Sequence, residues 1–298
     1  MKITVFSLWR DSESYINKAL SQVEALEANN KDVEFEYYFY ENDSKDNTKS
    51  ILEDFLRDRQ GEVVSEVLNA PKFGSVVDGE RMRSMARYRN KILHTAKPMD
   101  SDYCVVWDSD VEFEPDILNN FLKYKNEGAM LCSNIRQNVP CHMGSGDDTT
   151  YYDSLSLVDN YGIQCMGWAS NPFYDEGDRA KYEQGLPIEV IAAFGGFVLI
   201  KTNVLNMQDV EWYSNGTLEH WGLCDRIRNI AKEKVIFLPD VKVSVHIPEQ
   251  KMLEIRDKVQ PMLEFQKVRL KMSSWERQLM SNDIKEGYVG GHSPDHYV

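Results

Sequence analysis

The chain has 298 residues, enough to bury a large core in one big domain or two small ones. Its 42% hydrophobic and 11% aromatic content indicates a globular protein and excludes a disordered one. The net charge of −14 argues against a broad nucleic-acid-binding face, because such faces use Lys and Arg to neutralise phosphates.

The sequence lacks the usual signs of export or membrane insertion. Its five cysteines are an odd number without a Cys-x-x-Cys pair, which predicts reduced thiols and no zinc site. Arg10 and Asp11 come too early for a signal peptide, and the longest apolar run, 190–200, is about half a membrane span. We therefore predict a cytoplasmic protein without a membrane span, in which the sequon Asn215-Gly-Thr217 stays unmodified.

Strand and helix patterns alternate along most of the chain, which predicts a parallel sheet with helices on its faces. Runs of β-branched and aromatic residues mark the strands, and apolar stripes at helical spacing mark the helices. Strands are expected at 3–8, 33–40, 63–68, 103–107, 128–135, 191–200, 235–238 and 241–246, and helices at 11–26, 50–59, 80–96, 115–125 and 218–232.

The regular pattern breaks between about residues 137 and 187, where Gly, Asp, Tyr and Asn are frequent. So long an irregular stretch in a compact domain indicates a functional insertion. A helical pattern returns at 249–280, before a tail that contains two histidines. We therefore expect one domain over residues 1–247, with the insertion at 137–187, and a helical extension with a tail at 248–298.

The most informative motif is Asp108-Ser-Asp110, an Asp-x-Asp (DxD) motif directly after a buried strand pattern. Residues two apart on an extended chain point to the same side, so both carboxylates can reach one point. Such a pair suits Mg²⁺ or Mn²⁺, and ligands commonly bind at strand ends in open α/β sheets. For the motif taken alone, a solvated acidic turn is the alternative.

The helix expected before this strand is unusually rich in cations for an acidic protein. Its Arg83, Arg87 and Asn90 share a face by their spacing. Arg binds diphosphate oxygens bidentately, so phosphate contact is one interpretation, and a solvated surface with salt bridges is the other. The full set of cations is Arg81, Arg83, Arg87, Arg89 and Lys91.

These motifs, in this order, resemble those of the GT-A glycosyltransferases, which use nucleotide-sugar donors. The resemblance spans about residues 1–247 and implies an α/β, GT-A (Rossmann-like) fold: a mixed, mainly parallel sheet flanked by helices, with the irregular insertion and the C-terminal helical extension. Tyr151-Tyr-Asp153-Ser and the Glu219-His220 pair are most similar to the fungal capsule-associated and related α-mannosyltransferases. The other matching motifs are Glu41-Asn-Asp43, Arg83-x-x-Ala86-x-x-Arg89-Asn90, Asp108-Ser-Asp110 and Gly195-Gly196.

The resemblance implies a metal-dependent hexosyltransferase and a role for each matching position. Mn²⁺ or Mg²⁺ would be held by Asp108, Asp110 and His246, with His292 and His296 as weaker candidates for the histidine. The implied donor-binding residues are Ser7, Glu41, Asp43, Arg83, Arg89, Asn90 and Asp108, and the implied acceptor-binding residues are Tyr151, Asp153, Trp168 and Gly196. Tyr152 and Tyr174 of the insertion would also shape the acceptor site; the alternative is that its aromatic residues form a small core of their own.

The catalytic positions implied by the resemblance are Glu219 and His220. Inverting members of this fold commonly place an acidic base where this helix begins, but here His220 occupies the second position of the usual acidic pair. Three alternatives stay open: Glu219 is the base, His220 is the base, or the enzyme retains the anomeric configuration and needs no strong base. The likeness to mannosyltransferases favours retention.

The expected donor is a GDP- or UDP-linked hexose, mannose-like or glucose-like. The acceptor is a glycan, a protein, a lipid-linked sugar or, less readily in so acidic a chain, a modified nucleic acid; the oligomeric state stays open. Two other functions compete. A nucleotidyltransferase usually has a glycine-rich loop after its first strand, which residues 7–13 lack. A non-catalytic carbohydrate- or nucleotide-binding protein would not need both aspartates and the arginine-rich helix.

Overall fold

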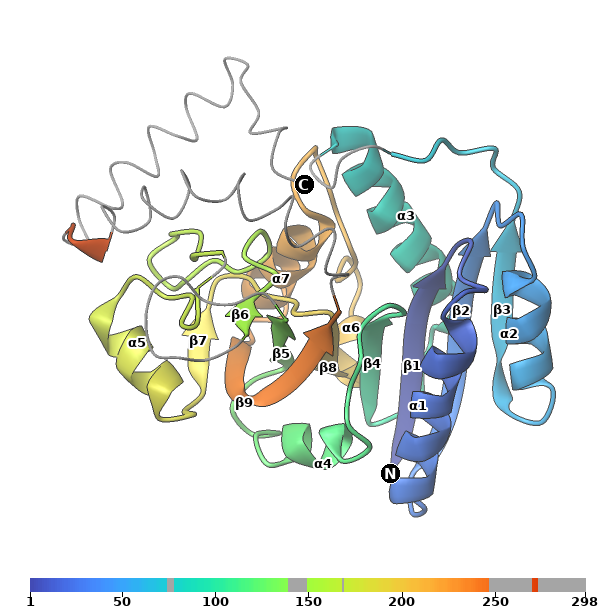
Figure 1. The fold of residues 1–298 in the computed structure, drawn as a ribbon, viewed down its shortest axis with the longest axis horizontal. Coiled ribbons are helices and arrows are strands. Elements are labelled where there is room, and N and C mark those ends of the chain that lie inside the picture. Colours follow the sequence, from blue (N-terminus) through green and yellow to red (C-terminus); the bar gives the residue numbers. More distant parts are fainter. Residues whose placement is uncertain (74–77, 139–148, 168, 247–269, 273–298) are drawn as a thin grey trace.

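The structure is a computed structural model that describes residues 1–73, 78–138, 149–167, 169–246 and 270–272. The described strands are β1 (Lys2–Trp9), β2 (Glu34–Asn42), β3 (Gln60–Glu66), β4 (Tyr103–Asp108), β5 (Met130–Gln137), β6 (Thr150–Tyr151), β7 (Ile188–Val190), β8 (Phe197–Lys201) and β9 (Val235–Val245). They form one mixed sheet in the order β3-β2-β1-β4-β8-β5-β9-β7, with β6 beside β5 (Figure 1).

The sheet changes character at β4. From β3 to β4 all neighbours are parallel, as the strand–helix alternation predicts. Strand β8 then runs antiparallel to both β4 and β5, β9 is parallel to β5, and β7 is antiparallel to β9. The predicted α/β fold with a mixed, mainly parallel sheet is therefore confirmed.

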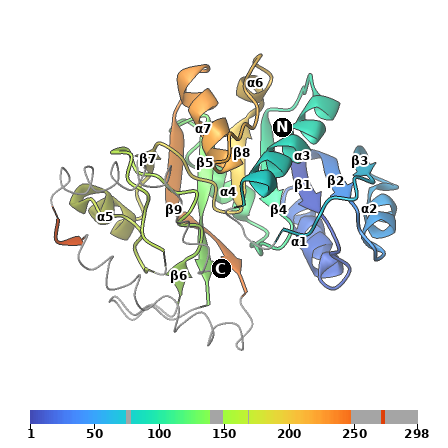
Figure 2. The same ribbon diagram turned by 90° about the horizontal axis from the view of Figure 1, so that it is seen from above.

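Helices cover both faces of the sheet. The described helices are α1 (Ile16–Asn29), α2 (Thr48–Leu56), α3 (Gly79–Ala96), α4 (Ile117–Leu122), α5 (Glu176–Glu183), α6 (Thr202–Leu205) and α7 (Glu219–Asn229). Helix α1 buries the predicted stripe that begins at Ile16 and ends at Leu26. Helix α3 lies on the opposite face from α1, next to α7 (Figure 2). The amide groups of its first turn are capped by the Asp78 side chain, which accepts hydrogen bonds from the Glu80 and Arg81 N–H groups.

Several predicted element bounds are wrong. Of the strand expected at 191–200, only the end from Phe197 onward is strand, in β8; residues 191–196 form the loop between β7 and β8, which turns at Gly195 and Gly196, where φ is +73° and +72°. The two strands expected at 235–246 are one strand, β9, which pairs with β5 through a register shift. Helix α1 begins at Ile16 and not near Asp11, whose own φ is +49°.

Part of the predicted insertion is fixed to the sheet by Arg136 at the end of β5. Its buried guanidinium donates to the Thr149 carbonyl at 2.7 Å, the Ser170 carbonyl at 2.8 Å and the Tyr182 hydroxyl at 2.9 Å. The predicted C-terminal extension lies outside the described residues except for 270–272. Within the described part of the chain, no helix is both long and apolar enough to cross a membrane.

Candidate active site

Asp108 ends β4 in the middle of the sheet, and Asp110 follows in the adjoining turn. Their neighbourhood is built by the backbone: the Asp108 N–H donates to the Gly196 carbonyl at 2.9 Å, and the Val111 N–H donates to the Asp108 carbonyl at 3.0 Å. Asp110 is exposed to solvent. Desolvation by the nearby protein, together with the charge of Asp108, raises the pKa of Asp110 to about 6.

Arg89 of α3 joins Asp108 to the beginning of α7. Its side chain is 2% exposed, its Nη2 donates to Asp108 Oδ1 at 2.9 Å, and its Nε donates to Glu219 Oε1 at 3.4 Å. The guanidinium carbon also lies 5.1 Å from the centre of the Phe194 ring. Burial opposes the charged form, but the two carboxylates outweigh it and raise the pKa of Arg89. A buried cation therefore holds two carboxylates that are far apart in the sequence.

His220 is held on three sides. Its ring stacks on Phe194 with centroids 3.6 Å apart and planes 12° from parallel. Trp212 Nε1, which can only donate, lies 3.4 Å from His220 Nδ1, and His220 Nε2 lies 3.3 Å from Glu219 Oε1. This pattern puts the proton of a neutral imidazole on Nε2. Burial, then the charges of Arg89 and Arg81, keep the pKa of His220 well below its usual range.

Asp153 reaches the same region from the insertion. Its Oδ2 accepts hydrogen bonds from the Ser156 hydroxyl and, at 3.0 Å, from the Gly195 N–H. Burial, together with the charge of Asp108, raises the pKa of Asp153 to about 6 even though these hydrogen bonds lower it. Since Gly196 accepts from Asp108, the two-glycine turn connects Asp153 to the end of β4.

The turn needs glycine for steric reasons as well as for its positive φ. A Cβ on Gly195 would lie 2.2 Å from the Ser133 carbonyl oxygen, and one on Gly196 would lie 2.6 Å from a Val111 methyl carbon. Glycine at position 196 is therefore required by the fold, while the contact of Gly196 with the acceptor stays a prediction.

The two tyrosines before Asp153 have different surroundings. Tyr151 was predicted to bind the acceptor, but its side chain is fully buried and its ring packs against Phe237. Tyr152 is 45% exposed. Partial burial and the charges of Asp110, Asp153 and Asp108 raise the pKa of Tyr152 to about 12, which places Tyr152 within electrostatic range of the acidic groups. The expected part of Tyr152 in shaping the acceptor site stays a prediction.

The donor residues predicted on and just after β1 and β2 are either buried or hydrogen-bonded within the protein. Ser7 is fully buried. Glu41 accepts hydrogen bonds from the Ser44 N–H and the Ser65 hydroxyl, both at 2.8 Å. Burial tends to raise the pKa of Asp43, but hydrogen bonds from the N–H groups of residues 68–70 and from Asn42 outweigh it and lower that pKa to about 2. Asp43 thus holds the loop after β3, while Glu41 joins the turn after β2 to β3 itself. The contact of either carboxylate with a nucleotide stays a prediction.

The remaining predicted residues are spread over the molecule. Asn90 makes two hydrogen bonds to the Trp212 backbone, at 2.7 and 2.8 Å, and exposed Arg83 pairs with Glu80 at 2.6 Å. His246 is exposed at the end of β9. No three His, Cys, Asp or Glu side chains of the described residues form a metal-binding group, so the structure does not bring Asp108, Asp110 and His246 together. Trp168, His292 and His296 lie outside the described residues.

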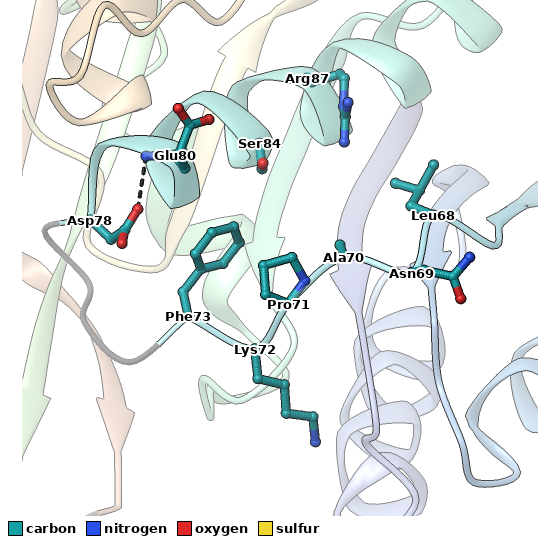
Figure 3. A pocket seen from close by; sticks show the side chains of 10 residues that line it. All are labelled: Leu68, Asn69, Ala70, Pro71, Lys72, Phe73, Asp78, Glu80, Ser84 and Arg87. Atoms are coloured by element: carbon teal, nitrogen blue, oxygen red, sulfur yellow. Dashed lines mark hydrogen bonds between the residues drawn. The ribbon is translucent and has the colours of Figure 1, made fainter.

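A pocket of 630 Å³ lies between the loop 68–73 and the beginning of α3, and the ring of Phe73 points from the loop toward the helix (Figure 3). Glu80, Ser84 and Arg87 form its helical wall. Arg89 is about half a turn further round α3 and points toward Asp108, so the pocket and the buried charges lie on different faces of the helix. The lining residues are Leu68, Asn69, Ala70, Pro71, Lys72, Phe73, Asp78, Glu80, Ser84 and Arg87.

Solved structures of glycosyltransferases share this fold. TarS 1-349 from S. aureus in complex with UDP-GlcNAc has a TM-score of 0.50 and 16% identity, over 84% of this chain and 59% of TarS 1-349. The mannosyltransferase PcManGT from Pyrobaculum calidifontis, in complex with GDP-Man and Mn²⁺, has a TM-score of 0.50 and 14% identity, over 98% and 76% of the two chains. GalNAc-T7 with UDP, GalNAc and Mn²⁺ has a TM-score of 0.54 and 14% identity, over 83% and 43%.

These similarities confirm the predicted GT-A fold. The model of the family described as Cryptococcal mannosyltransferase 1 matches residues 13–227, most of the chain, so the protein belongs to that family, and the predicted glycosyltransferase class is confirmed. No curated protein sequence matches the chain. The chain spans less than two thirds of the length of TarS 1-349.

Proposed function

We propose that the protein transfers a hexose from a GDP- or UDP-sugar to an acceptor hydroxyl, with a divalent cation bound by Asp108 and Asp110. The observation that carries the proposal is the position of this pair: Asp108 ends β4 and Asp110 follows it, at the carboxyl end of the parallel half of the sheet, where ligands of α/β folds bind. The family assignment favours a mannose-like sugar. PcManGT, which shares the fold, binds GDP-Man, whereas TarS binds UDP-GlcNAc.

The carboxylates fit a Mn²⁺ or Mg²⁺ ion that also binds the donor. Such ions are commonly held by one or two carboxylates, with diphosphate oxygens and water completing the shell. Asp108 and Asp110 supply that number of protein ligands, and a third is not needed. The ion would stabilise negative charge on the leaving diphosphate.

Asp153 and Tyr152 are proposed to face the acceptor. Asp153 Oδ2 is held by the Gly195 N–H, so the carboxylate has a fixed orientation. Its Oδ1 has no hydrogen-bond partner within the described ranges and can accept from a sugar hydroxyl. The half-exposed ring of Tyr152 offers an apolar face for a sugar ring. Because its orientation is fixed, the Asp153 carboxylate can orient the attacking hydroxyl, and this orientation lowers the entropic part of the barrier to transfer.

Retention of configuration is part of the proposal. Support comes from α7, where both ring nitrogens of His220 are engaged and Glu219 is only 4% exposed. Neither residue therefore stands as an accessible base beside an acceptor. Proton NMR of the glycoside formed from GDP-α-mannose tests this point: an α-linked product supports retention, and a β-linked product contradicts it.

The donor is tested by thermal shift with GDP, GDP-mannose, UDP, UDP-glucose and UDP-GlcNAc, each with Mn²⁺, Mg²⁺ or EDTA. We expect a metal-dependent stabilisation by one nucleoside diphosphate, which D110N abolishes. D116N is the matched control, because Asp116 is also exposed and its side chain caps no helix. Stabilisation that is unchanged in EDTA or in D110N would contradict the proposed metal pair.

A further inference from the structure

Arg89 is shared unequally between two carboxylates. Its bond to Asp108 is short, 2.9 Å, while its bond to Glu219 is long, 3.4 Å. Its Nη1 is buried without a hydrogen-bond partner in the part of the chain that the structure describes. The guanidinium therefore depends on these two carboxylates for charge compensation, since a buried cation without a partner is strongly destabilising.

The two carboxylates differ in their access to solvent. The Asp108 side chain is 36% exposed and lies next to Asp110, so a ligand can reach it. The Glu219 side chain is 5% exposed and is also in contact with His220. Arg89 cannot follow a ligand outward, because its own side chain is 2% exposed and lies over the Phe194 ring. Any loss of interaction with Asp108 must be compensated by Glu219.

We propose that Arg89 is a positioning residue that couples ligand binding at Asp108 to Glu219. This inference rests on the proposed function, in which a divalent cation binds Asp108. When it ligates a cation, Asp108 would interact less strongly with Arg89, and the guanidinium would then interact more strongly with Glu219. Because coupling is reciprocal, Glu219 in turn favours cation binding: it compensates part of the Arg89 charge and leaves Asp108 available.

The coupling predicts an effect of a residue that does not touch the cation. In E219Q, Arg89 has Asp108 as its remaining anionic partner among the residues described, so Asp108 becomes a poorer ligand. We expect E219Q to weaken Mn²⁺ binding at least fivefold, at the lower end of typical coupling between sites. Mn²⁺ binding to the full chain is measured by the EPR signal of the free ion, which needs no catalytic activity.

Two variants separate this coupling from a simple loss of negative charge. D153N removes a carboxylate whose charge acts on the site but for which the structure gives no contact with Arg89, and we expect a smaller effect than that of E219Q. R89K keeps the positive charge but replaces a planar fork by a point charge that cannot bridge both carboxylates in the same way. In the R89K background, E219Q is expected to change Mn²⁺ affinity less than twofold.

The outcomes are distinct. Equal effects of E219Q and D153N, or a full effect of E219Q in the R89K background, would overturn the coupling while leaving the proposed function intact. Should R89K fail to fold, the comparison of E219Q with D153N decides alone. Absence of Mn²⁺ binding by the wild-type chain, with and without GDP or UDP, would overturn both the proposed metal dependence and the coupling.

Discussion

Replacing His220 by glutamine separates a positioning role from general-base catalysis. The Gln amide can donate to Glu219 Oε1 and accept from Trp212 Nε1, as the imidazole does, but it has no basic nitrogen. If His220 only orients Glu219, H220Q weakens one hydrogen bond. Such a bond contributes about 1 kcal/mol, so the turnover rate should fall by roughly tenfold or less. Loss of a general base would lower it by roughly 10²- to 10⁴-fold.

H220A leaves a larger packing defect than H220Q. The imidazole stacks on Phe194 at 3.6 Å and is 6% exposed, so its removal leaves a cavity. Truncation of a large core side chain to Ala costs about 2 to 5 kcal/mol, and the small imidazole belongs near the lower limit. We expect the free energy of unfolding, measured in urea, to fall by about 2 to 3 kcal/mol in H220A and by less in H220Q.

The assay is donor-saturated turnover of wild type, H220Q and H220A, with donor affinity measured separately. A rate loss above about 100-fold in H220Q, with unchanged donor affinity and unfolding free energy, would show that the imidazole transfers a proton. That result would refute the tautomer deduced from Trp212, because it requires a free lone pair on the ring.

Three further predictions concern the acidic groups and the glycine turn. D110N should abolish cation-dependent donor binding in calorimetry while its far-UV spectrum stays unchanged, and tight binding by this variant would contradict the metal assignment. Burial raises the pKa of Asp159 to about 6, so the ionised carboxylate destabilises the fold above about pH 6, and this effect is absent below pH 4. Between pH 4 and 7.5, the unfolding free energy of D159N should therefore rise relative to that of wild type by about 2 to 3 kcal/mol. A difference between the two proteins that does not change with pH would refute this prediction. G195A should lower the unfolding free energy by at least about 3 kcal/mol, because its Cβ would lie 2.2 Å from the Ser133 carbonyl oxygen. G162A should lower it by only about 1 kcal/mol, because φ is also positive there but the nearest atom to the Cβ lies 3.9 Å away. Equal losses in the two variants would refute the steric argument.

The first half of the fold could be predicted because its signals are local. Strands β1, β2 and β4 contain runs of apolar and aromatic residues followed by a polar turn, β3 has only the pair Val63 and Val64, and the buried stripe of α1 shows the expected period. Asp108 lies at the end of β4 for the same reason. The loop between β7 and β8 could not be predicted, because residues 191–196 are as apolar as a strand and only the paired glycines signal the turn.

The helix face that meets the site was the harder prediction. Spacing selected Arg83, Arg87 and Asn90, and only the resemblance named Arg89, which is the residue that contacts Asp108. Arg81 also acts on the site, since its charge lowers the pKa of Asp110, Tyr152 and His220. A helical pattern gives the spacing of the cations but does not say which face is packed against α7. That choice depends on contacts between residues 130 positions apart, such as Arg89 and Glu219.

The sequence prediction named both tyrosines of the insertion but did not say which of them is buried. Successive residues of an extended segment point to opposite sides, and the arrangement with Tyr151 buried and Tyr152 half-exposed follows this rule. Which of the two faces the core depends on the pairing of β6 with β5, where Tyr151 is opposite Arg136. A two-residue strand carries too little pattern to fix that register from sequence alone.

The site and the stability of the fold depend on the same buried ion pairs. Strand order puts the end of β4 between β1 and β8, and α3 and α7 meet on one face of the sheet. Arg89 is buried there because Asp108 and Glu219 compensate its charge, so removing either carboxylate leaves a partly uncompensated cation. Variants at these three positions must therefore be compared at equal folded fraction. A rate loss that persists after this correction measures their contribution to the site, whereas one that disappears measures only their contribution to folding.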